Sequence, residues 1–91
     1  MNRKNEKISV EEIQSGLFHF MKANIVDKAV ICDVDTSFQE LKIDSLSMVE
    51  MILFLERKYS ISIPETELIP ENFKSVKVLA ACAHRCLRNE G

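Results

Sequence analysis

A chain of 91 residues, of which 46% are hydrophobic and 29% charged, has room for one compact domain but not for an enzyme with its own deep pocket. Two glycines and two prolines are too few for a linker, and the longest apolar stretch, residues 51–55, is too short to cross a membrane. The net charge of −2 conceals an acidic centre, because residues 33–71 hold nine acids and three bases, and this disfavours binding to a nucleic-acid backbone.

The first predicted helix begins after Ser9, because Ser9 and Glu12 form the S-x-x-E pattern of a capping box. Apolar residues at helical spacing follow on one side of it: Val10, Ile13, Leu17, Phe20 and Met21. We expect this helix to end between Lys22 and Asn24. Residues 25–41 then form a long connection that is too polar at its tip to be a buried strand. Loops of this length in compact domains are often functional.

The second predicted helix begins near Ser45 and ends near Lys58 or Tyr59, and nine of the fourteen residues 46–59 are apolar. This exceeds the needs of one core-facing stripe, which we assign to Met48, Met51, Ile52, Leu55 and Tyr59. A second stripe consists of Leu46, Val49 and Leu53, whereas Phe54 falls on the polar side with Ser47, Glu50 and Arg57. We expect Leu53 and Phe54 to contact a partner protein, while packing against the long connection explains Val49 equally well.

The last third of the chain predicts one short and one long helix. Residues 61–64 form an extended turn, because the residue before Pro64 is disfavoured in the helical region. We expect one short helical turn within residues 65–73, interrupted by Pro70. Ser75 then caps a last helix that runs from residue 76 to about Leu87. Its inward face is predicted to consist of Val76, Leu79, Ala80, Ala83 and Leu87.

Together these elements predict an all-α, four-helix bundle with a long loop between its first two helices and a short third helix. We expect one domain at residues 9–88, with a flexible N-terminus at 1–8 and a frayed C-terminus at 89–91. The basic start of the chain leads into no apolar segment of the kind found in a secretory signal. The sequence therefore indicates a cytoplasmic protein with no membrane partner.

Two groups of chemically reactive or charged residues are not predicted to form sites. The three cysteines, Cys32, Cys82 and Cys86, form no CxxC pair and no zinc-ligand cluster with the histidines, so we predict reduced thiols and no metal. Four basic residues near the C-terminus could form a local patch: Lys74, Lys77, Arg85 and Arg88. A nucleic-acid-binding protein normally has a wider basic footprint, so we interpret this patch as a solvated face and predict no nucleic-acid partner.

The tripeptide Asp44-Ser45-Leu46 stands at the start of the second helix. Taken alone, a serine in this position is most often a helix N-cap. Further matches follow along the chain, namely Val49-Glu50, Leu55-Glu56, Ile63-Pro64 and the run Asn72-Phe73-Lys74-Ser75-Val76. This ensemble resembles the acyl carrier and peptidyl carrier protein family over about residues 9–88. The run at 72–76 is similar to that of stand-alone carriers that work beside adenylating enzymes.

The resemblance implies that 4′-phosphopantetheine is attached to Ser45, between Asp44 and Leu46. A phosphopantetheinyl transferase would add this arm from coenzyme A, and the backbone N–H groups at a helix start suit its phosphate. Acyl or aminoacyl intermediates would then travel as thioesters on the arm. Because the cofactor supplies the chemistry, the chain is predicted to be a non-catalytic carrier. We also expect it to be a monomer. Its implied partners are an adenylating or acyl-transferring loading enzyme and a downstream synthase, transferase or thioesterase.

Two departures from the family pattern are informative. The residue two positions before Asp44 is commonly glycine in the family but is Lys42 here, so either the loop takes another path or Lys42 tolerates the same one. The second helix is typically strongly acidic in fatty-acid carriers, whereas here it also contains Arg57 and Lys58. We therefore expect less electrostatic steering and more apolar recognition, and a dedicated secondary-metabolite pathway. The residues predicted to recognise partners are Glu50, Leu53, Phe54 and Arg57.

The sequence leaves the cargo open between an amino acid, a short acid and a long acyl chain. Two rival functions also stay open. One is an unmodified helical interaction module in which Ser45 is only a helix cap. The other is a regulatory or accessory subunit that binds its partner through residues 46–57 and does so equally well without an arm.

Overall fold

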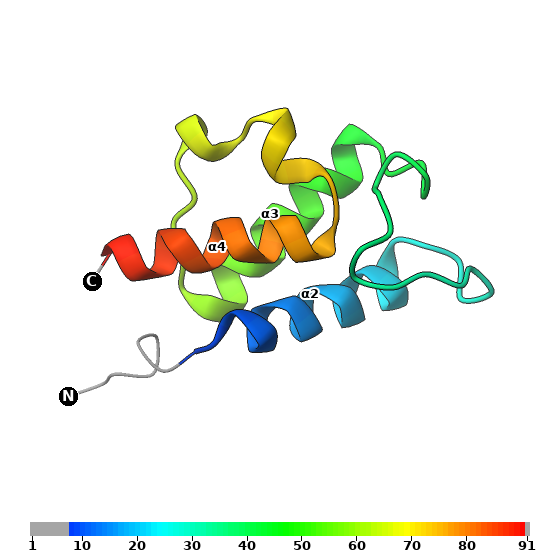
Figure 1. The fold of residues 1–91 in the computed structure, drawn as a ribbon, viewed down its shortest axis with the longest axis horizontal. Helices are drawn as coiled ribbons and strands as arrows, with labels where there is room; N and C mark the ends of the chain where they lie inside the picture. The colour runs from blue at the N-terminus through cyan, green and yellow to red at the C-terminus, as the bar shows by residue number, and fades with distance from the viewer. Residues whose placement is uncertain (1–7, 91) are drawn as a thin grey trace.

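The computed structural model describes residues 8–90, with side chains described as far as residue 87. The elements, in chain order, are α2 (Val10–Asn24), α3 (Ser45–Tyr59), the 3-10 helices η1 (Glu65–Glu67) and η2 (Pro70–Phe73), and α4 (Val76–Glu90) (Figure 1). The all-α prediction is confirmed, and no strand occurs within residues 8–90. Most of the predicted flexible ends, residues 1–7 and 91, lie outside the described residues.

The region of the predicted short third helix contains two separate 3-10 turns, so the described chain has three α-helices. Pro70 does not interrupt a turn but opens η2. A proline is well tolerated at the first helical position, because its missing N–H would have no intrahelical partner there. The last helix also continues to Glu90, beyond the predicted end near Leu87.

The predicted caps of the first and last helices are confirmed. The Glu12 backbone N–H donates to Ser9 Oγ at 3.1 Å, and α2 ends at Asn24, within the predicted range. The Val78 backbone N–H donates to Ser75 Oγ at 3.3 Å at the start of α4. Each cap satisfies a backbone donor that the helix itself leaves without a partner, so these local signals fix where the two helices begin.

The core lies where α2 packs against both α4 and α3 (Figure 1). All five residues predicted to face inward on α4 are buried. On α3 the buried residues are Met51, Leu55 and Tyr59, whereas Met48 and Ile52 are only partly buried. The long connection adds to the core one residue that was not predicted there, because Phe38 is only 2% exposed.

The long connection between α2 and α3 is joined to the start of α4. The Phe38 N–H donates to the Lys74 carbonyl at 2.8 Å, and the Lys77 N–H donates to the Val34 carbonyl at 2.9 Å. Ser37 and Ser75 form an isolated antiparallel bridge between the same two segments. The segment that leads into α3 is therefore anchored by backbone hydrogen bonds as well as by the buried Phe38 ring.

A close contact fixes α3 against α2. The Tyr59 hydroxyl donates to the Glu12 carbonyl at 3.3 Å. It lies over Gly16, where a Cβ atom would come within 2.0 Å of the hydroxyl oxygen. Burial, and secondarily the negative charge of Glu12, raises the pKa of Tyr59. Gly16 is thus the residue that lets the tyrosine approach the α2 backbone.

The cysteines behave as small hydrophobic residues. Cys82 and Cys86 are buried on α4 and Cys32 is partly buried, and no disulfide joins the three. Burial is the main factor that raises the pKa of the Cys82 thiol to about 12. Within the described part of the chain, no cluster of histidine, cysteine and acidic side chains could hold a metal ion. Among the same residues, no helix is long and apolar enough to cross a membrane.

Two of the four basic residues near the C-terminus lie beside acids. Lys77 Nζ is 3.8 Å from Asp35, and the Arg85 guanidinium is 3.4 Å from Glu67. The Arg85 guanidinium also donates to Asn72, which is 8% exposed. These contacts fit the interpretation of this patch as an ordinary surface. Those of Arg85 join η1 and η2 to α4, and that of Lys77 joins the long connection to α4. The side chain of Arg88 lies outside the described residues.

Candidate functional site

Asp44 is the N-cap of α3. Its backbone is extended, and its Oδ1 atom accepts the Ser47 backbone N–H at 2.9 Å. Hydrogen bonding to the Ser47 backbone, and then to the Ser47 side chain, holds the pKa of Asp44 below its ordinary value. The interpretation of Ser45 as the helix cap is therefore wrong. Asp and Ser are both good N-caps, and only the backbone path shows which of these neighbours fills the position.

Ser45 is the first residue of α3 and is exposed. Within the described part of the chain, its hydroxyl makes no hydrogen bond. The first turn of α3 contains no acidic side chain, and the N-terminal N–H groups of a helix favour a nearby anion. An exposed hydroxyl at such a position can accept a phosphoryl group and present it to solvent.

Lys42 adopts the left-handed backbone conformation that glycine favours, with φ of 57°. The family commonly has glycine at this position, and Lys42 tolerates the backbone conformation that glycine would adopt there. Three successive backbone hydrogen bonds close the turn. The Leu41 N–H donates to the Ser37 carbonyl at 3.2 Å, and the Lys42 N–H donates to the Gln39 carbonyl at 3.1 Å. The Ile43 N–H donates to the Phe38 carbonyl at 3.0 Å. The turn leads directly into Asp44 and sets the direction in which α3 begins.

The second apolar stripe of α3 is exposed. Leu46, Val49 and Leu53 are 68%, 51% and 40% exposed, and we call these three residues the α3 apolar face. The explanation of Val49 by packing against the long connection therefore fails. Glu50 and Arg57 are exposed on the same helix. Three apolar side chains at helical spacing, accompanied by charged ones, are typical of a surface that binds a partner protein.

Phe54, which is predicted to contact a partner protein, also makes contacts within the molecule. It is partly buried, and its ring stacks on Phe20 of α2 with centroids 4.4 Å apart and lies edge-on to Tyr59 at 6.2 Å. Both contacts lie within the molecule, because α2 passes along this side of α3. The remaining surface of Phe54 lines a shallow hollow of about 440 Å³ with Phe20 and Lys58.

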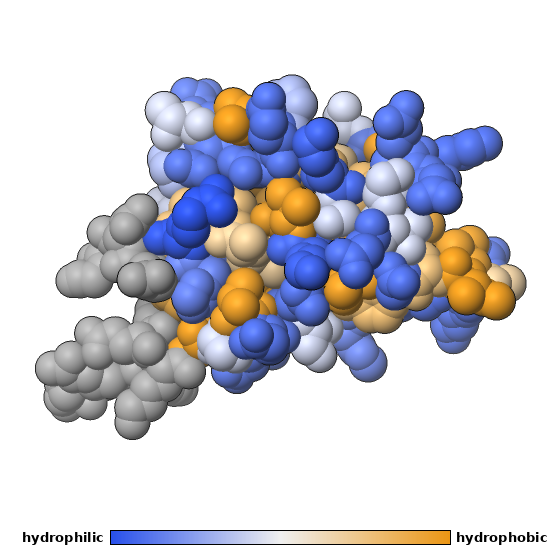
Figure 2. Space-filling model, in the orientation of Figure 1, coloured by the Kyte–Doolittle hydropathy of each residue, from blue (hydrophilic) through white to orange (hydrophobic). Residues whose placement is uncertain are grey.

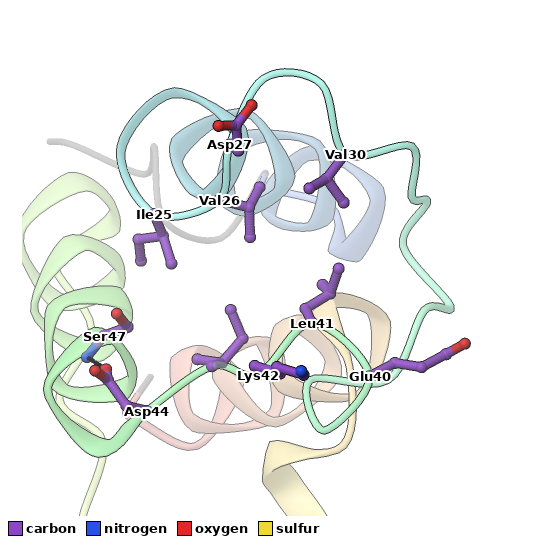
Figure 3. Close-up of a pocket in the computed structure, with 10 residues that line it drawn as sticks. Ile25, Val26, Asp27, Val30, Glu40, Leu41, Lys42, Asp44 and Ser47 are labelled. Atoms are coloured by element: carbon purple, nitrogen blue, oxygen red, sulfur yellow. Dashed lines mark hydrogen bonds between the residues drawn. The ribbon is translucent and has the colours of Figure 1, made fainter.

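A second hollow, of about 420 Å³, lies beside the start of α3, and we call it the loop hollow. Its lining residues come from both ends of the long connection and from the start of α3 (Figure 3): Ile25, Val26, Asp27, Val30, Glu40, Leu41, Lys42, Ile43, Asp44 and Ser47. Figure 2 shows apolar side chains gathered at this end of the molecule. Ile31, next to the hollow in sequence, is 98% exposed. No pattern in the sequence indicates this hollow, because the hollow depends on the path of the long connection.

A family model described as "Phosphopantetheine attachment site" matches residues 23–83, which is more than half of the chain. The chain belongs to this family. The match spans the long connection, α3, the two 3-10 turns and the first half of α4, and so includes Asp44, Ser45 and Leu46.

Relatives with assigned names agree with the family. Aminoacyl carrier protein 2 of Bradyrhizobium diazoefficiens is 28% identical over 69 residues, covering 74% of this chain and 78% of the relative. Aminoacyl carrier protein 1 of the same organism is 27% identical over 70 residues, covering 75% and 78%. An acyl carrier protein of Brachyspira hyodysenteriae is 42% identical over 53 residues, covering 58% and 65%.

The chain is therefore a carrier of acyl or aminoacyl groups linked through a covalent 4′-phosphopantetheine, and not an enzyme. Carriers of this kind interact with phosphopantetheinyl transferases and with synthetic enzymes. The geometry at the start of α3 fits the prosthetic group. A phosphodiester requires an exposed hydroxyl with room for a charged substituent, and Ser45 offers one beside the N-terminal N–H groups of a helix.

Proposed function

We propose that Ser45 carries the 4′-phosphopantetheine arm and that the chain delivers aminoacyl or acyl thioesters between the enzymes of a dedicated, secondary-metabolite pathway. The observation that carries this proposal is the division of roles at the start of α3. Asp44 caps the helix, which leaves the exposed Ser45 hydroxyl free for modification. The arm, once attached, supplies the thiol on which the cargo is held.

Three of the other serine hydroxyls in the matched region are less suitable. Ser37 Oγ accepts the Glu40 backbone N–H at 3.0 Å, and Ser75 is buried as the cap of α4. Ser47 is partly buried and hydrogen-bonds with Asp44. Modification of any of these three would break a hydrogen bond that holds a turn or a helix start. Ser45 could be modified without such a loss.

We assign partner recognition to the α3 apolar face together with Glu50 and Arg57. Leu53 contributes apolar contact area next to these charged residues, which orient the partner. Phe54 stacks on Phe20 and so fixes α3 against α2, and its remaining exposed surface would add to the contact with the partner. The transferase and the loading enzyme would both approach this face, since it includes Leu46, the residue after Ser45.

An amino acid is the better-supported cargo. The two relatives that match the larger share of this chain are named aminoacyl carrier proteins. We propose an adenylating enzyme as the loading partner, with a synthase, transferase or thioesterase acting downstream, all in the cytoplasm, where reduced cysteines are expected. Because α3 carries basic as well as acidic residues, these partners would rely less on electrostatic steering than the partners of a strongly acidic carrier.

Intact-protein mass spectrometry tests the proposal. The purified chain is incubated with coenzyme A, Mg²⁺ and a phosphopantetheinyl transferase of broad specificity, beside Ser45→Ala and Ser47→Ala. We expect a single phosphopantetheine adduct on the wild type and on Ser47→Ala, and none on Ser45→Ala. Absence of an adduct from folded wild-type protein with several transferases would refute the assignment, as would an adduct that persists in Ser45→Ala.

A further inference from the structure

We infer that the hollow between α2 and α3 receives an apolar side chain of a partner protein, and that the same partner places a carboxylate beside it. We call it the aromatic hollow, because the stacked rings of Phe20 and Phe54 line it. The inference rests on the proposed function and deepens it. It extends the surface assigned to partner recognition, and it names the chemistry of the partner at that point.

The aromatic hollow adjoins the surface assigned to partner recognition. Phe54 directly follows Leu53 of the α3 apolar face, and Lys58 lies about one turn further along α3. The opposite wall belongs to α2, which contributes Phe20 and Ala23. A protein that docks on the α3 apolar face would therefore reach the hollow without leaving the surface of α3.

The walls of the hollow offer apolar area that is already fixed in place. The rings of Phe20 and Phe54 stack with centroids 4.4 Å apart, and the Tyr59 ring lies edge-on to Phe54 at 6.2 Å. Both phenylalanines are only partly buried. The small residues Gly16 and Ala23 also line the hollow, whose volume of about 440 Å³ has room for one large side chain. Because the walls are fixed beforehand, an apolar anchor would enter with little loss of conformational freedom.

The charge of the hollow is opposite in sign to that of the chain as a whole. The chain has a net charge of −2, yet among the described residues that line the hollow none is acidic, and Lys58 is basic. The Lys58 ammonium lies 5.9 Å from the centre of the Tyr59 ring, and within the described part of the chain no acidic side chain forms an ion pair with it. His19, which is exposed on the α2 wall, adds a ring N–H donor. A partner carboxylate would therefore meet an unpaired ammonium group, whereas a partner ammonium would meet a like charge.

Four capped dipeptides test the inference on the full chain before the arm is attached. Aspartyl-phenylalanine has both features, asparaginyl-phenylalanine lacks the charge, lysyl-phenylalanine reverses it, and aspartyl-alanine lacks the ring. NMR follows the ring resonances of Phe20 and Phe54 and the methyl resonance of Ala23 during each titration. We expect saturable shifts with the three phenylalanine peptides and none with aspartyl-alanine. The aspartyl peptide should bind about twofold to fivefold more tightly than the asparaginyl peptide, as one exposed ion pair predicts, and the lysyl peptide should bind most weakly.

Two pairs of matched variants separate docking from general effects. Lys58→Glu and Lys28→Glu change the net charge equally and both lysines are exposed, but only Lys58 lines the aromatic hollow. We expect Lys58→Glu to remove or reverse the preference for the aspartyl peptide and Lys28→Glu to retain it. Ala23→Leu should fill the hollow and weaken the binding of all three phenylalanine peptides, whereas Ala29→Leu, at an exposed alanine outside the hollow, should not. Circular dichroism shows whether each variant is folded.

The outcomes keep this inference distinct from the proposed function. If the resonances do not respond to the phenylalanine peptides, or if the preference for the aspartyl peptide persists in Lys58→Glu, the inference is overturned and the assignment of the arm to Ser45 stands. Shifts that grow with the concentration of the chain alone would assign the hollow to a second copy and overturn the inference. Shifts caused by a loaded arm would assign it to the cargo, with the same result. Peptide binding by folded chain that no transferase modifies would support the hollow and refute only the carrier role of Ser45.

Discussion

Replacement of Gly16 by alanine should destabilise the fold through Tyr59. The new Cβ atom would lie 2.0 Å from the Tyr59 hydroxyl oxygen, whereas ordinary contact begins at 3.4 Å. The hydroxyl is the end of a rigid ring that is 6% exposed and lies edge-on to Phe54, so it cannot move aside without disturbing its neighbours. It would also lose its hydrogen bond to the Glu12 carbonyl.

The size of the expected loss follows from two destabilising contributions and one stabilising contribution to the free energy of unfolding. Overpacking of this kind costs about 1–3 kcal/mol, and the lost hydrogen bond costs about 0.5–1.5 kcal/mol. Alanine in place of a mid-helix glycine returns about 1 kcal/mol through the lower entropy of the unfolded chain. We expect a net loss of about 2 kcal/mol, which lowers the melting temperature of a domain of this size by roughly 8–16 °C.

A double-mutant cycle isolates the clash. In the Tyr59→Phe background the oxygen is absent, and the nearest ring atom would lie 3.3 Å from the new Cβ, close to ordinary contact. There Gly16→Ala should be neutral, or should stabilise the fold by up to about 1 kcal/mol, so the two substitutions couple strongly. Urea unfolding of the four proteins, followed by circular dichroism, measures this coupling. Equal effects of Gly16→Ala in both backgrounds would refute the reasoning.

Two further predictions concern the start of α3. Lys42→Gly should raise the free energy of unfolding by about 0.5 kcal/mol in urea unfolding, because glycine adopts the left-handed conformation without strain and this gain outweighs the added entropy of the unfolded chain. Lys42→Ala retains a Cβ atom and should show no such gain. The pKa of Asp44 is lower in the folded chain than its ordinary value near 3.8, so the ionised carboxylate stabilises the fold at any pH above that value. This stabilisation is lost as the pH falls through the lowered pKa of the folded chain. Asp44→Asn, which keeps a capping side chain, should therefore lose less stability than the wild type in urea titrations below about pH 4; identical profiles would contradict this.

The sequence predicted those features of the fold that depend on local patterns. The caps at Ser9 and Ser75 and the end of α2 follow from hydrogen bonds that a residue makes within one helical turn. The inward face of α4 follows from helical periodicity in the same way. The position of Ser45 at the start of α3 was also predicted, but its neighbour Asp44 supplies the cap, and two adjacent good cap residues cannot be ranked from composition alone.

The features that the sequence did not predict depend on contacts between distant segments. Phe54 was placed on a polar face because the spacing within α3 contains no information about where α2 passes. Phe38 was assigned to a loop, and its burial results from the hydrogen bonds that join that loop to α4. The loop hollow likewise forms only where both ends of the long connection lie side by side, and the spacing of apolar residues contains no information about that contact.

The backbone bonds between the long connection and α4 have a consequence for the timing of synthesis. The turn before α3 sets the direction of that helix, and it includes a hydrogen bond to the Phe38 carbonyl. The Phe38 N–H in turn donates to the Lys74 carbonyl, more than thirty residues later in the chain. A growing chain that has left the ribosome only as far as Tyr59 already contains Ser45 but lacks these partners. A transferase that recognises the shape around Ser45 would therefore act on finished chains and pass over incomplete ones.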